Sequence, residues 1–502
     1  MNLFSQIRAA IASPGKTFIE TPAGAPMTYG DMLARSGQLA NVLAAHGVRP
    51  GDRVAAQVEK TPENLLLYLA TLRAGAVFLP LNTAYTLAEL DYFIGDSEPA
   101  LIVCDSAKQT GFVEIAGKRG IRAVETLDAS GEGMLTEAAA KASPEFSDVV
   151  RGSHDLAAIL YTSGTTGRSK GAMLTHDNLA SNAQTLAEYW HFTDKDVLLH
   201  ALPVYHTHGL FVASNTVMLS GGAMIFLSKF DADEVMRLLP KATAMMGVPT
   251  FYTRLLKHPG LTKAACKHMR LFTSGSAPLL AETHIEFQQK TGHAILERYG
   301  MTETNMNTSN PYDGDRIAGT VGFPLPGVEL RIADPETGKE LPQGETGGIE
   351  IKGPNVFPGY WRMPEKTKAE FRADGFFITG DVGKIDDRGY VHIVGRAKDL
   401  IITGGFNVYP KEIESEIDAL PGVAESAVIG CPHPDFGEGV TAVIVCKPGA
   451  DLSEKAVIGE LEQRLAKFKL PKRVIFMDDL PRNTMGKVQK NVLRDRHAKL
   501  YG

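Results

Sequence analysis

Short apolar runs alternate with helix-like amphipathic segments through the first two thirds of the chain. Each run is bounded by glycine, proline or polar residues, which is typical of strands buried on both faces of a sheet. The strands expected here are Val54–Val58, Ala76–Leu81, Ala100–Cys104 and Ala223–Leu227, and the helices are Pro62–Ala74 and Asp231–Leu239. This alternation predicts an α/β fold of layered sheets with mostly parallel strands.

The pattern changes twice toward the C-terminus. Between Gly319 and Val394, glycine and proline turns separate the short strands Glu329–Ala333, Gly348–Lys352 and Tyr390–Val394, which predicts an antiparallel, barrel-like part. Beyond Arg396 we expect helices over Glu412–Ala419, Ser453–Lys467 and Lys487–Lys499, and strands over Val423–Gly430, Thr441–Lys447 and Val474–Met477. The chain is thus predicted to form a large N-terminal domain, residues 1–396, and a small, mobile α+β C-terminal domain, residues 397–502.

Composition and charge exclude several classes of partner. The 502 residues are 44% apolar and 22% charged, as in ordinary globular proteins, and a net charge of −6 attracts neither nucleic acid nor an anionic membrane. The four cysteines form no Cys-x-x-Cys pair, which fits a reducing compartment. The longest uncharged stretch, Val197–Ser228, is broken by Pro203, His206 and His208 and is no membrane span. We expect a cytoplasmic protein that is a monomer or a small homo-oligomer and has no signal peptide.

The segment from Tyr161 to Gly171 combines glycines, hydroxyls and a lysine directly after an apolar run. Backbone N–H groups in such a turn, with hydroxyls and a cation, can hold phosphate. The candidate phosphate ligands are Thr162, Ser163, Gly164, Thr165, Thr166, Gly167 and Lys170. The segment is not a P-loop, because Arg168-Ser169 replaces the required Lys-Ser/Thr and the apolar run Ala172–Leu174 follows in place of a helix. The alternative is a flexible surface hairpin.

Four further motifs follow along the chain, each at the end of an apolar run or in a turn. They are Glu297–Glu303, Thr379-Gly380-Asp381, Gly395–Asp399 and Pro481–Lys487. In this order, together with the glycine-rich segment, they resemble the motifs of the adenylate-forming superfamily, which includes acyl-CoA synthetases, luciferases and peptide-synthetase adenylation domains. The resemblance covers nearly the whole chain.

The resemblance implies a two-step reaction that consumes ATP. A carboxylate attacks the α-phosphate of ATP to give an acyl-adenylate and pyrophosphate, and the thiol of coenzyme A then displaces AMP. Because two anions must approach each other, such a site supplies cations and N–H donors. Mg²⁺, a hard cation that requires an oxygen ligand, would be held by Glu303.

The resemblance also implies which residues hold the nucleotide. Lys170 and the loop before it would hold the β- and γ-phosphates. Tyr299 would stack on the adenine, and Asp381, beside Arg396, would accept hydrogen bonds from the ribose hydroxyls. The other ATP-binding candidates that the resemblance implies are Ser276, Ala277, Glu297, Gly300, Met301 and Thr302.

Catalysis and domain movement are assigned in the same way. Thr302 would donate to the α-phosphate, and Lys487 would bridge the α-phosphate and the substrate carboxylate, so that with Glu303 they form the catalytic set. Lys398 matches the hinge of the family, about which the small domain swings. The second arrangement would withdraw Lys487 and bring Gly404-Gly405 to the site where coenzyme A reacts.

Arg298 indicates which carboxylic acid is the substrate. A guanidinium is costly to bury beside an alkyl chain, but it can grip a second carboxylate through two parallel hydrogen bonds. With Ser276 and His206 completing that grip, the chain resembles the malonyl-CoA synthetase branch, whose substrates are malonate and sometimes methylmalonate. Two alternatives stay open: Arg298 pairs with a carboxylate elsewhere, or the substrate is another short-chain, medium-chain or aryl acid.

Other classes of function have weaker support. His206 and His208 have no nearby cysteine or acidic residue to complete a zinc site. Asp435-Phe436-Gly437 looks like a kinase metal motif, but no catalytic-loop motif precedes it. A non-catalytic nucleotide-binding relative remains an alternative, although the polar residues of every motif are retained.

Overall fold

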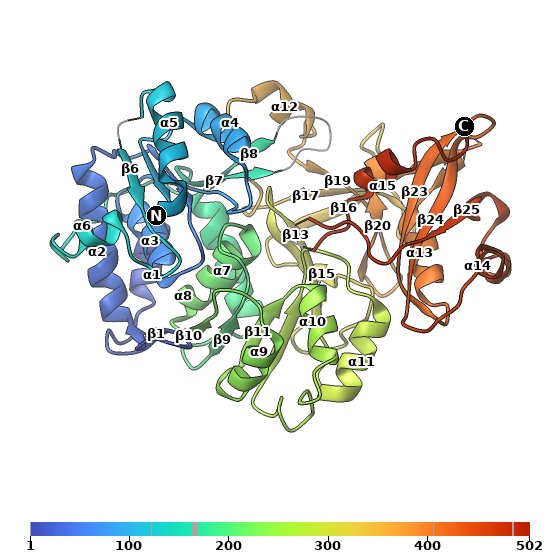
Figure 1. The fold of residues 1–502 in the computed structure, drawn as a ribbon, viewed down its shortest axis with the longest axis horizontal. Coiled ribbons are helices and arrows are strands. Elements are labelled where there is room, and N and C mark those ends of the chain that lie inside the picture. Colours follow the sequence, from blue (N-terminus) through green and yellow to red (C-terminus); the bar gives the residue numbers. More distant parts are fainter. Residues whose placement is uncertain (1, 122, 163–168, 405, 484–485) are drawn as a thin grey trace.

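A computed structural model describes residues 2–121, 123–162, 169–404, 406–483 and 486–502. Figure 1 shows a broad N-terminal part with stacked sheets and helices, and a smaller C-terminal part set to one side of it. This division agrees with the α/β fold of a large N-terminal and a small C-terminal domain expected from the sequence. No helix in the described part of the chain is long and apolar enough to cross a membrane.

Two sheets form the body of the N-terminal domain. One has the strand order β15-β14-β13-β12-β11-β9-β10-β1-β2 and the other has the order β18-β8-β7-β4-β3-β5-β6. The bounds of the first are β1 Thr17–Glu20, β2 Met27–Thr28, β9 Val197–His200, β10 Ala223–Phe226, β11 Ala244–Gly247, β12 Leu271–Ser274, β13 Leu296–Met301, β14 Asn305–Ser309 and β15 Phe323–Pro324. Those of the second are β3 Arg53–Gln57, β4 Val77–Pro80, β5 Leu101–Cys104, β6 Ala123–Thr126, β7 Leu156–Thr162, β8 Lys170–Thr175 and β18 Gly359–Tyr360.

Their central strands pair in parallel, as predicted: β9 to β13 in one sheet, and β3 to β7 in the other. The helices that cover them are α1 Leu3–Ala9, α2 Tyr29–Ala45, α3 Pro62–Arg73, α4 Leu87–Ser97, α5 Gln109–Arg119, α6 Met134–Ala139, α7 His176–Tyr189, α8 Thr216–Ser220, α9 Ala232–Leu238, α10 Pro249–Leu256, α11 Ala281–Thr291 and α12 Pro364–Ala369. Helix α7 lies between the sheets and contacts both β7 and β14.

The antiparallel part expected after Gly319 is a sheet with the order β16-β17-β19-β20. Its strands are β16 Glu329–Ala333, β17 Gly347–Lys352, β19 Phe377–Ile385 and β20 Val391–Arg396, all antiparallel to their neighbours. The C-terminal sheet has β21 Ile401–Thr403, β22 Phe406–Val408, β23 Val423–His433, β24 Gly437–Cys446 and β25 Arg473–Phe476, with helices α13 Pro410–Asp418, α14 Glu454–Leu461 and α15 Lys490–Arg496.

Two of the expected C-terminal helices are shorter than predicted. Helix α14 ends at Leu461 rather than Lys467, and α15 spans Lys490–Arg496 rather than Lys487–Lys499. Beyond α14 the chain turns, because Leu465 and Phe468 pack onto the core of the small domain and the Phe468 ring stacks on Phe406 with centroids 4.7 Å apart. Amphipathic spacing indicates only that the apolar residues face the core. Here those residues reach the core from a turn, without a helix.

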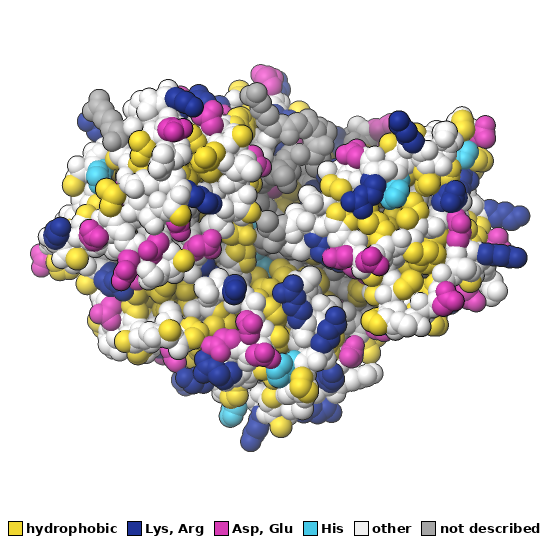
Figure 2. Space-filling view, in the orientation of Figure 1, with side chains coloured by type: hydrophobic (Ala, Val, Ile, Leu, Met, Phe, Trp, Pro, Cys, Tyr) yellow, Lys and Arg dark blue, Asp and Glu magenta, His cyan; other side chains and the backbone are white. Residues whose placement is uncertain are grey.

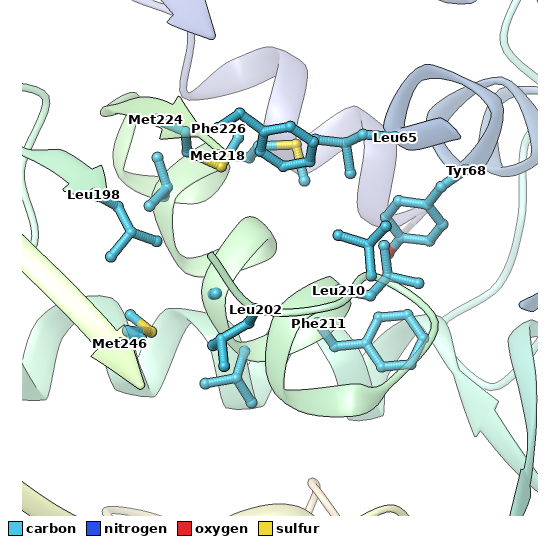
Figure 3. Close-up of a cluster of buried hydrophobic side chains, with 14 of the residues drawn as sticks. Leu65, Tyr68, Leu198, Leu202, Leu210, Phe211, Met218, Met224, Phe226 and Met246 are labelled. Atoms are coloured by element: carbon cyan, nitrogen blue, oxygen red, sulfur yellow. The ribbon is translucent and has the colours of Figure 1, made fainter. Parts of the chain in front are cut away.

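The uncharged stretch Val197–Ser228 is a buried strand, a helix and a second strand, as expected. Between β9 and β10 the chain forms a π-helix, η2, over His208–Asn215 that continues into α8. π-Helical turns are rare and often mark functional sites. Figure 3 shows Leu210 and Phe211 of η2 among apolar side chains from α3, α8, β9 and β10, including Leu65, Tyr68, Met218 and Phe226. The helix is therefore held in a dense apolar core.

A substitution at Gly209, in the first turn of η2, tests this packing. A Cβ atom there would overlap the carbonyl oxygen of Pro203. We expect Gly209→Ala to lower the free energy of unfolding by about 1–3 kcal/mol, the usual cost of overpacking a core. The exposed Gly117, in α5, has open space around its Cα, so Gly117→Ala should raise stability by about 0.5–1 kcal/mol. Urea unfolding monitored by circular dichroism measures both variants, and equal stability of the two would contradict this account of η2.

Candidate functional site

The candidate residues of the Glu297–Glu303 motif lie on β13 and in the turn that follows it. Successive side chains of a strand point to opposite faces, so Glu297 and Tyr299 share one face and Arg298 has the other. A register shift between Tyr299 and Gly300 bends the strand before it turns into β14. A Cβ atom at Gly300 would overlap the carbonyl oxygen of Asn305, so this tight turn requires glycine.

Tyr299, Asp381 and Arg396 form one hydrogen-bonded group. Asp381 of β19 lies opposite Arg396 of β20, with Arg396 Nε 2.7 Å from Asp381 Oδ1. The hydroxyl of Tyr299 donates to Asp381 Oδ2 over 2.5 Å. The carboxylate is buried and raises the pKa of Arg396. The structure thus brings together the residues expected to hold the adenosine, although they come from two different sheets.

Glu297 is directed elsewhere. Its carboxylate lies 3.1 Å from Nδ1 of His284, on α11, and accepts a hydrogen bond of 3.3 Å from the backbone N–H of Gly319. Burial raises its pKa. Through these contacts Glu297 links β13 to α11 and to the loop before β15. Its carboxylate therefore stabilises the strand that carries Tyr299.

The glycine-rich segment joins two antiparallel strands. Thr162 ends β7 and pairs with Lys170, the first residue of β8, so the apolar run after the loop is a strand and not a helix. The other loop candidates, Ser163, Gly164, Thr165, Thr166 and Gly167, lie outside the described residues. Nζ of Lys170 lies 3.1 Å from Oε1 of Glu370 and 4.1 Å from the centre of the Tyr360 ring.

Glu303 is the expected Mg²⁺ ligand, and it is buried close to Lys170. The hydroxyl of Tyr360 lies 3.0 Å from Oε1 of Glu303 and 2.7 Å from Oε2 of Glu370. Burial raises the pKa of Glu303, while the charges of Lys170 and Arg396 oppose that shift. Among the described residues no group of three or more acidic, histidine or cysteine side chains could form a metal cage. A single buried carboxylate fits Mg²⁺ that is shared with nucleotide phosphates, because such sites use one or two carboxylates.

Lys487 lies in a loop of the C-terminal domain that reaches the N-terminal domain. Gly486 sits close to Thr250, at the start of α10: a Cβ atom there would be 3.4 Å from its Cγ2. The loop is braced by Asn483, whose Oδ1 accepts from the N–H of Lys487 over 2.9 Å. The amine of Lys487 is open to solvent at the rim of the site, yet surrounding protein atoms, and next the charge of Arg396, lower its pKa to about 8.

The hinge candidates lie at the base of the small domain. Lys398 is in a short 3₁₀ turn, Ala397–Asp399, and Asp399 Oδ1 accepts from Nη2 of Arg494, on α15, over 2.9 Å. Burial lowers the pKa of Lys398. Gly404 adopts φ = +58° in the β21–β22 turn, and its N–H donates to the carbonyl of Phe436. Gly405 lies outside the described residues.

Arg298 lies on the opposite face of β13, with 4% of its surface exposed. Its guanidinium packs over Gly275, where any side chain would collide with it. Within the described ranges, Nε and Nη2 of Arg298 have no hydrogen-bond partner. Burial lowers its pKa to about 9, and no carboxylate among the described residues pairs with it to oppose that shift.

The surroundings of Arg298 offer further unpaired polar groups. His208 Nδ1 lies 3.1 Å from Oγ of Ser276, and the N–H of His208 is 3.3 Å from His206 Nδ1. Burial, and then the charge of Arg298, lower the pKa of His206 to about 4 and that of His208 as well. Buried side-chain atoms without a partner in the described part of the chain include His208 Nε2, Thr207 Oγ1 and Ser274 Oγ. The structure thus joins Arg298, Ser276 and His206 as expected and adds His208.

Other candidates surround this centre. Ser276, with φ = +69°, and Ala277 form the turn after β12, while Met301 and Thr302 are half-buried at the end of β13. Sequence reasoning missed Tyr360 and Glu370, which contact Lys170 and Glu303, and the contact of His208 with Ser276. These pairs are far apart along the chain, so no local pattern could have revealed them.

Figure 2 shows that the face seen in Figure 1 is hollowed between the N-terminal sheets and the C-terminal domain. Acidic and basic side chains are interspersed over this face, without a large area of one sign. This agrees with small molecules as substrates.

Comparisons with known proteins show which proteins the chain is similar to. Residues 8–361 match the family model described as AMP-binding enzyme, and residues 412–487 match the AMP-binding enzyme C-terminal domain. The chain is 37% identical to a feruloyl-CoA synthase of an Amycolatopsis species over 98% of both chains. It is 35% identical to a malonate–CoA ligase of Arabidopsis thaliana, over 92% of this chain and 81% of the relative. It is 67% identical to MatB from Rhodopseudomonas palustris, over 100% of this chain and 99% of MatB. The TM-score is 0.98 for the ATP-bound crystal structure of MatB and 0.87 for the apo crystal structure.

The lowered pKa of Lys487 predicts unusual reactivity of its amine. With a pKa of about 8, about half of the amines are neutral at pH 8, against fewer than roughly one in a hundred for an unperturbed lysine. Carbamylation by cyanate, followed by peptide mass spectrometry, should therefore level off above pH 8–9 at Lys487. The exposed Lys195 reports the pH dependence of the reagent alone. Labelling of Lys487 that rises in parallel with Lys195 up to pH 10 would contradict the lowered pKa.

Proposed function

The chain belongs to the AMP-binding enzyme family, and from this premise we propose that it joins malonate to coenzyme A at the expense of ATP. In the first step a carboxylate oxygen of malonate bonds to the α-phosphorus of ATP and pyrophosphate leaves. In the second step the thiolate of coenzyme A bonds to the acyl carbon and AMP leaves. Methylmalonate is proposed as a second substrate, because one methyl group changes discrimination by only about 1–3 kcal/mol.

The observation that carries the proposal is the buried guanidinium of Arg298. Burying a cation that has no protein carboxylate as a partner costs free energy, unless a bound ligand supplies the negative charge. His208 contacts Ser276 beside Arg298, and the unpaired Nε and Nη2 groups of Arg298 suit a carboxylate that accepts several hydrogen bonds. Malonate has one carboxylate for the reaction and a second for this pocket.

Each remaining group has a proposed task. Lys170, with the loop from Thr162, binds the β- and γ-phosphates, and Asp381 with Arg396 holds the ribose beside Tyr299. Mg²⁺ bound through Glu303 would neutralise phosphate charge. Lys487 donates to the α-phosphate and the attacking carboxylate, and its protonated form predominates below pH 8.

The overall similarity is greater to the ATP-bound than to the apo form of MatB, which supports the proposal that the domains are in the arrangement for adenylation.

The second step is proposed to use a different domain arrangement. The boundary lies near residues 396 and 397, with Lys398 as the hinge, and rotation there would withdraw Lys487 and present Gly404-Gly405 to coenzyme A. The partners proposed are small molecules alone, with no nucleic acid or membrane, and the enzyme is proposed to act in the cytoplasm as a monomer or small homo-oligomer.

One relative favours a second candidate. Full-length similarity to a feruloyl-CoA synthase supports an aryl acid as an alternative substrate. An aromatic ring would leave the guanidinium of Arg298 desolvated and unpaired, which disfavours this alternative. A non-catalytic nucleotide-binding relative is a further alternative, and retention of Lys170, Glu303, Asp381 and Lys487 disfavours it.

Pyrophosphate release with ATP and a panel of acids distinguishes these functions. Malonate should give the fastest release, ahead of acetate, butyrate and ferulate, and free malonyl-CoA should form only when coenzyme A is added. ATP turnover that does not depend on any acid would refute the ligase, and a preference for ferulate would refute the dicarboxylate pocket.

Arg298→Ala tests the pocket directly. Loss of one hydrogen bond to a charged group costs about 1.5–3 kcal/mol, so the KM for malonate should rise roughly ten- to a hundredfold. The KM for butyrate should change little, since butyrate lacks the second carboxylate. Arg316→Ala is the matched control, because Arg316 is a half-buried arginine that donates to backbone carbonyls away from the pocket. An unchanged malonate preference in Arg298→Ala would remove Arg298 from the substrate site.

A further inference from the structure

Lys60 is a buried lysine that none of the proposed steps uses. It immediately precedes Thr61, the N-cap of α3, and only 7% of its surface is exposed. Its Nζ lies 2.9 Å from Nδ1 and 2.7 Å from the carbonyl oxygen of His200, and 4.2 Å from the centre of the Phe226 ring. No carboxylate in the described ranges pairs with it. Burial lowers its pKa well below that of a free lysine.

Such a lysine adds little to stability. The region around Phe226 is apolar, as Figure 3 shows for Leu65 and Met218 beside it. Taking an ammonium group out of water is costly, and apolar residues of similar volume often replace buried charges without loss of stability. A methionine would fill this space with a side chain of similar length. The polar contacts of Lys60 therefore point to a task other than stability.

Lys60 determines how His200 is oriented. The carbonyl oxygen of Gly209 beside Nε2 of His200 can only accept a hydrogen bond, so the ring proton resides on Nε2 and Nδ1 accepts from Nζ of Lys60. Nε2 lies 3.0 Å from the carbonyl oxygen of Gly209 and 3.2 Å from Oγ of Ser214. Burial and the charge of Lys60 lower the pKa of His200, which keeps its ring neutral. The imidazole thus donates into the first turn of η2.

That turn carries one wall of the Arg298 pocket. Gly209 directly follows His208, whose imidazole contacts Ser276. Gly209 also packs against the carbonyl of Pro203, so the backbone has little room to shift. The chain of contacts from Lys60 through His200 to Gly209 therefore ends one residue from the pocket.

We propose that Lys60 and His200 are positioning residues of the malonate pocket: they fix the start of η2 so that His208 and Ser276 meet the carboxylate held by Arg298. The proposal rests on the proposed function, because it concerns the pocket for the second carboxylate. It assigns no contact between Lys60 and substrate.

Lys60→Met tests the proposal in the full-length enzyme. Methionine keeps the apolar packing, and relief from burying the amine offsets the loss of its two hydrogen bonds to His200, so the melting temperature should change little. The KM for malonate should rise on the order of tenfold or more, because small displacements of binding groups are costly. The KM for ATP should stay within about twofold of the wild-type value.

Tyr68→Phe is the matched control. It removes a buried hydrogen bond to the far end of η2, where the Tyr68 hydroxyl donates to Asn215 Oδ1 over 3.3 Å. This variant should lower the melting temperature and leave the KM for malonate unchanged. Lys60→Met with an unchanged KM for malonate would overturn the proposal, as would a parallel loss of stability, ATP affinity and turnover.

A ¹⁵N spectrum of histidine-labelled enzyme gives a second measurement that needs no substrate, with His200→Gln identifying the His200 signals. Nδ1 of His200 should appear as a hydrogen-bonded acceptor in the wild type and shift in Lys60→Met. An unchanged Nδ1 signal overturns the inference. If the wild type releases no pyrophosphate with malonate, the proposed function fails, and this spectrum still decides whether Lys60 orients His200.

Discussion

The guanidinium of Arg298 is buried and pairs with no carboxylate in the described part of the chain, and the surrounding structure is arranged to keep it there. Glycine at position 275 leaves room for it, and β13 presents it on the face opposite Tyr299. Because their own burial, and then the charge of Arg298, lower the pKa of His206 and His208, these rings stay neutral and add polar groups without adding positive charge. The result is a pocket with donors in excess of acceptors, and a dianionic acid satisfies it better than an alkyl or aryl acid.

The nucleotide side of the site depends on contacts between separate sheets and between domains. Asp381 and Arg396 come from the antiparallel sheet, Tyr299 comes from β13, and Lys487 reaches the site from the C-terminal domain. A second link between the domains is the ion pair of Lys447 with Glu282, at 2.8 Å on the surface. Exposed pairs contribute little, so this ion pair would not oppose the proposed rotation of the small domain.

Much of this could be predicted from the sequence. The apolar runs are buried on both faces, so the four strands predicted between Val54 and Leu227 match β3, β4, β5 and β10 to within about a residue, inside the usual margin. The motifs around Tyr299, Asp381 and Lys487 were recognisable because they occur in the order found in the adenylate-forming superfamily. The helix predicted over Ser453–Lys467 is present but ends at Leu461, because the apolar residues beyond it pack from a turn. The network of Tyr360 with Glu370, and the contact of Lys60 with His200, join residues that only tertiary packing brings together. The roles of the individual site residues remain predictions.

The central claim is that the buried guanidinium is reserved for a second carboxylate, and monomethyl malonate tests it most directly. This ester keeps one carboxylate for adenylation and nearly the shape of malonate, but it lacks the second charge. Pyrophosphate release by the wild-type enzyme should show a kcat/KM for malonate at least roughly ten- to a hundredfold above that for the ester, the value of one charge-assisted hydrogen bond. Equal kcat/KM values for the acid and its ester would contradict the account.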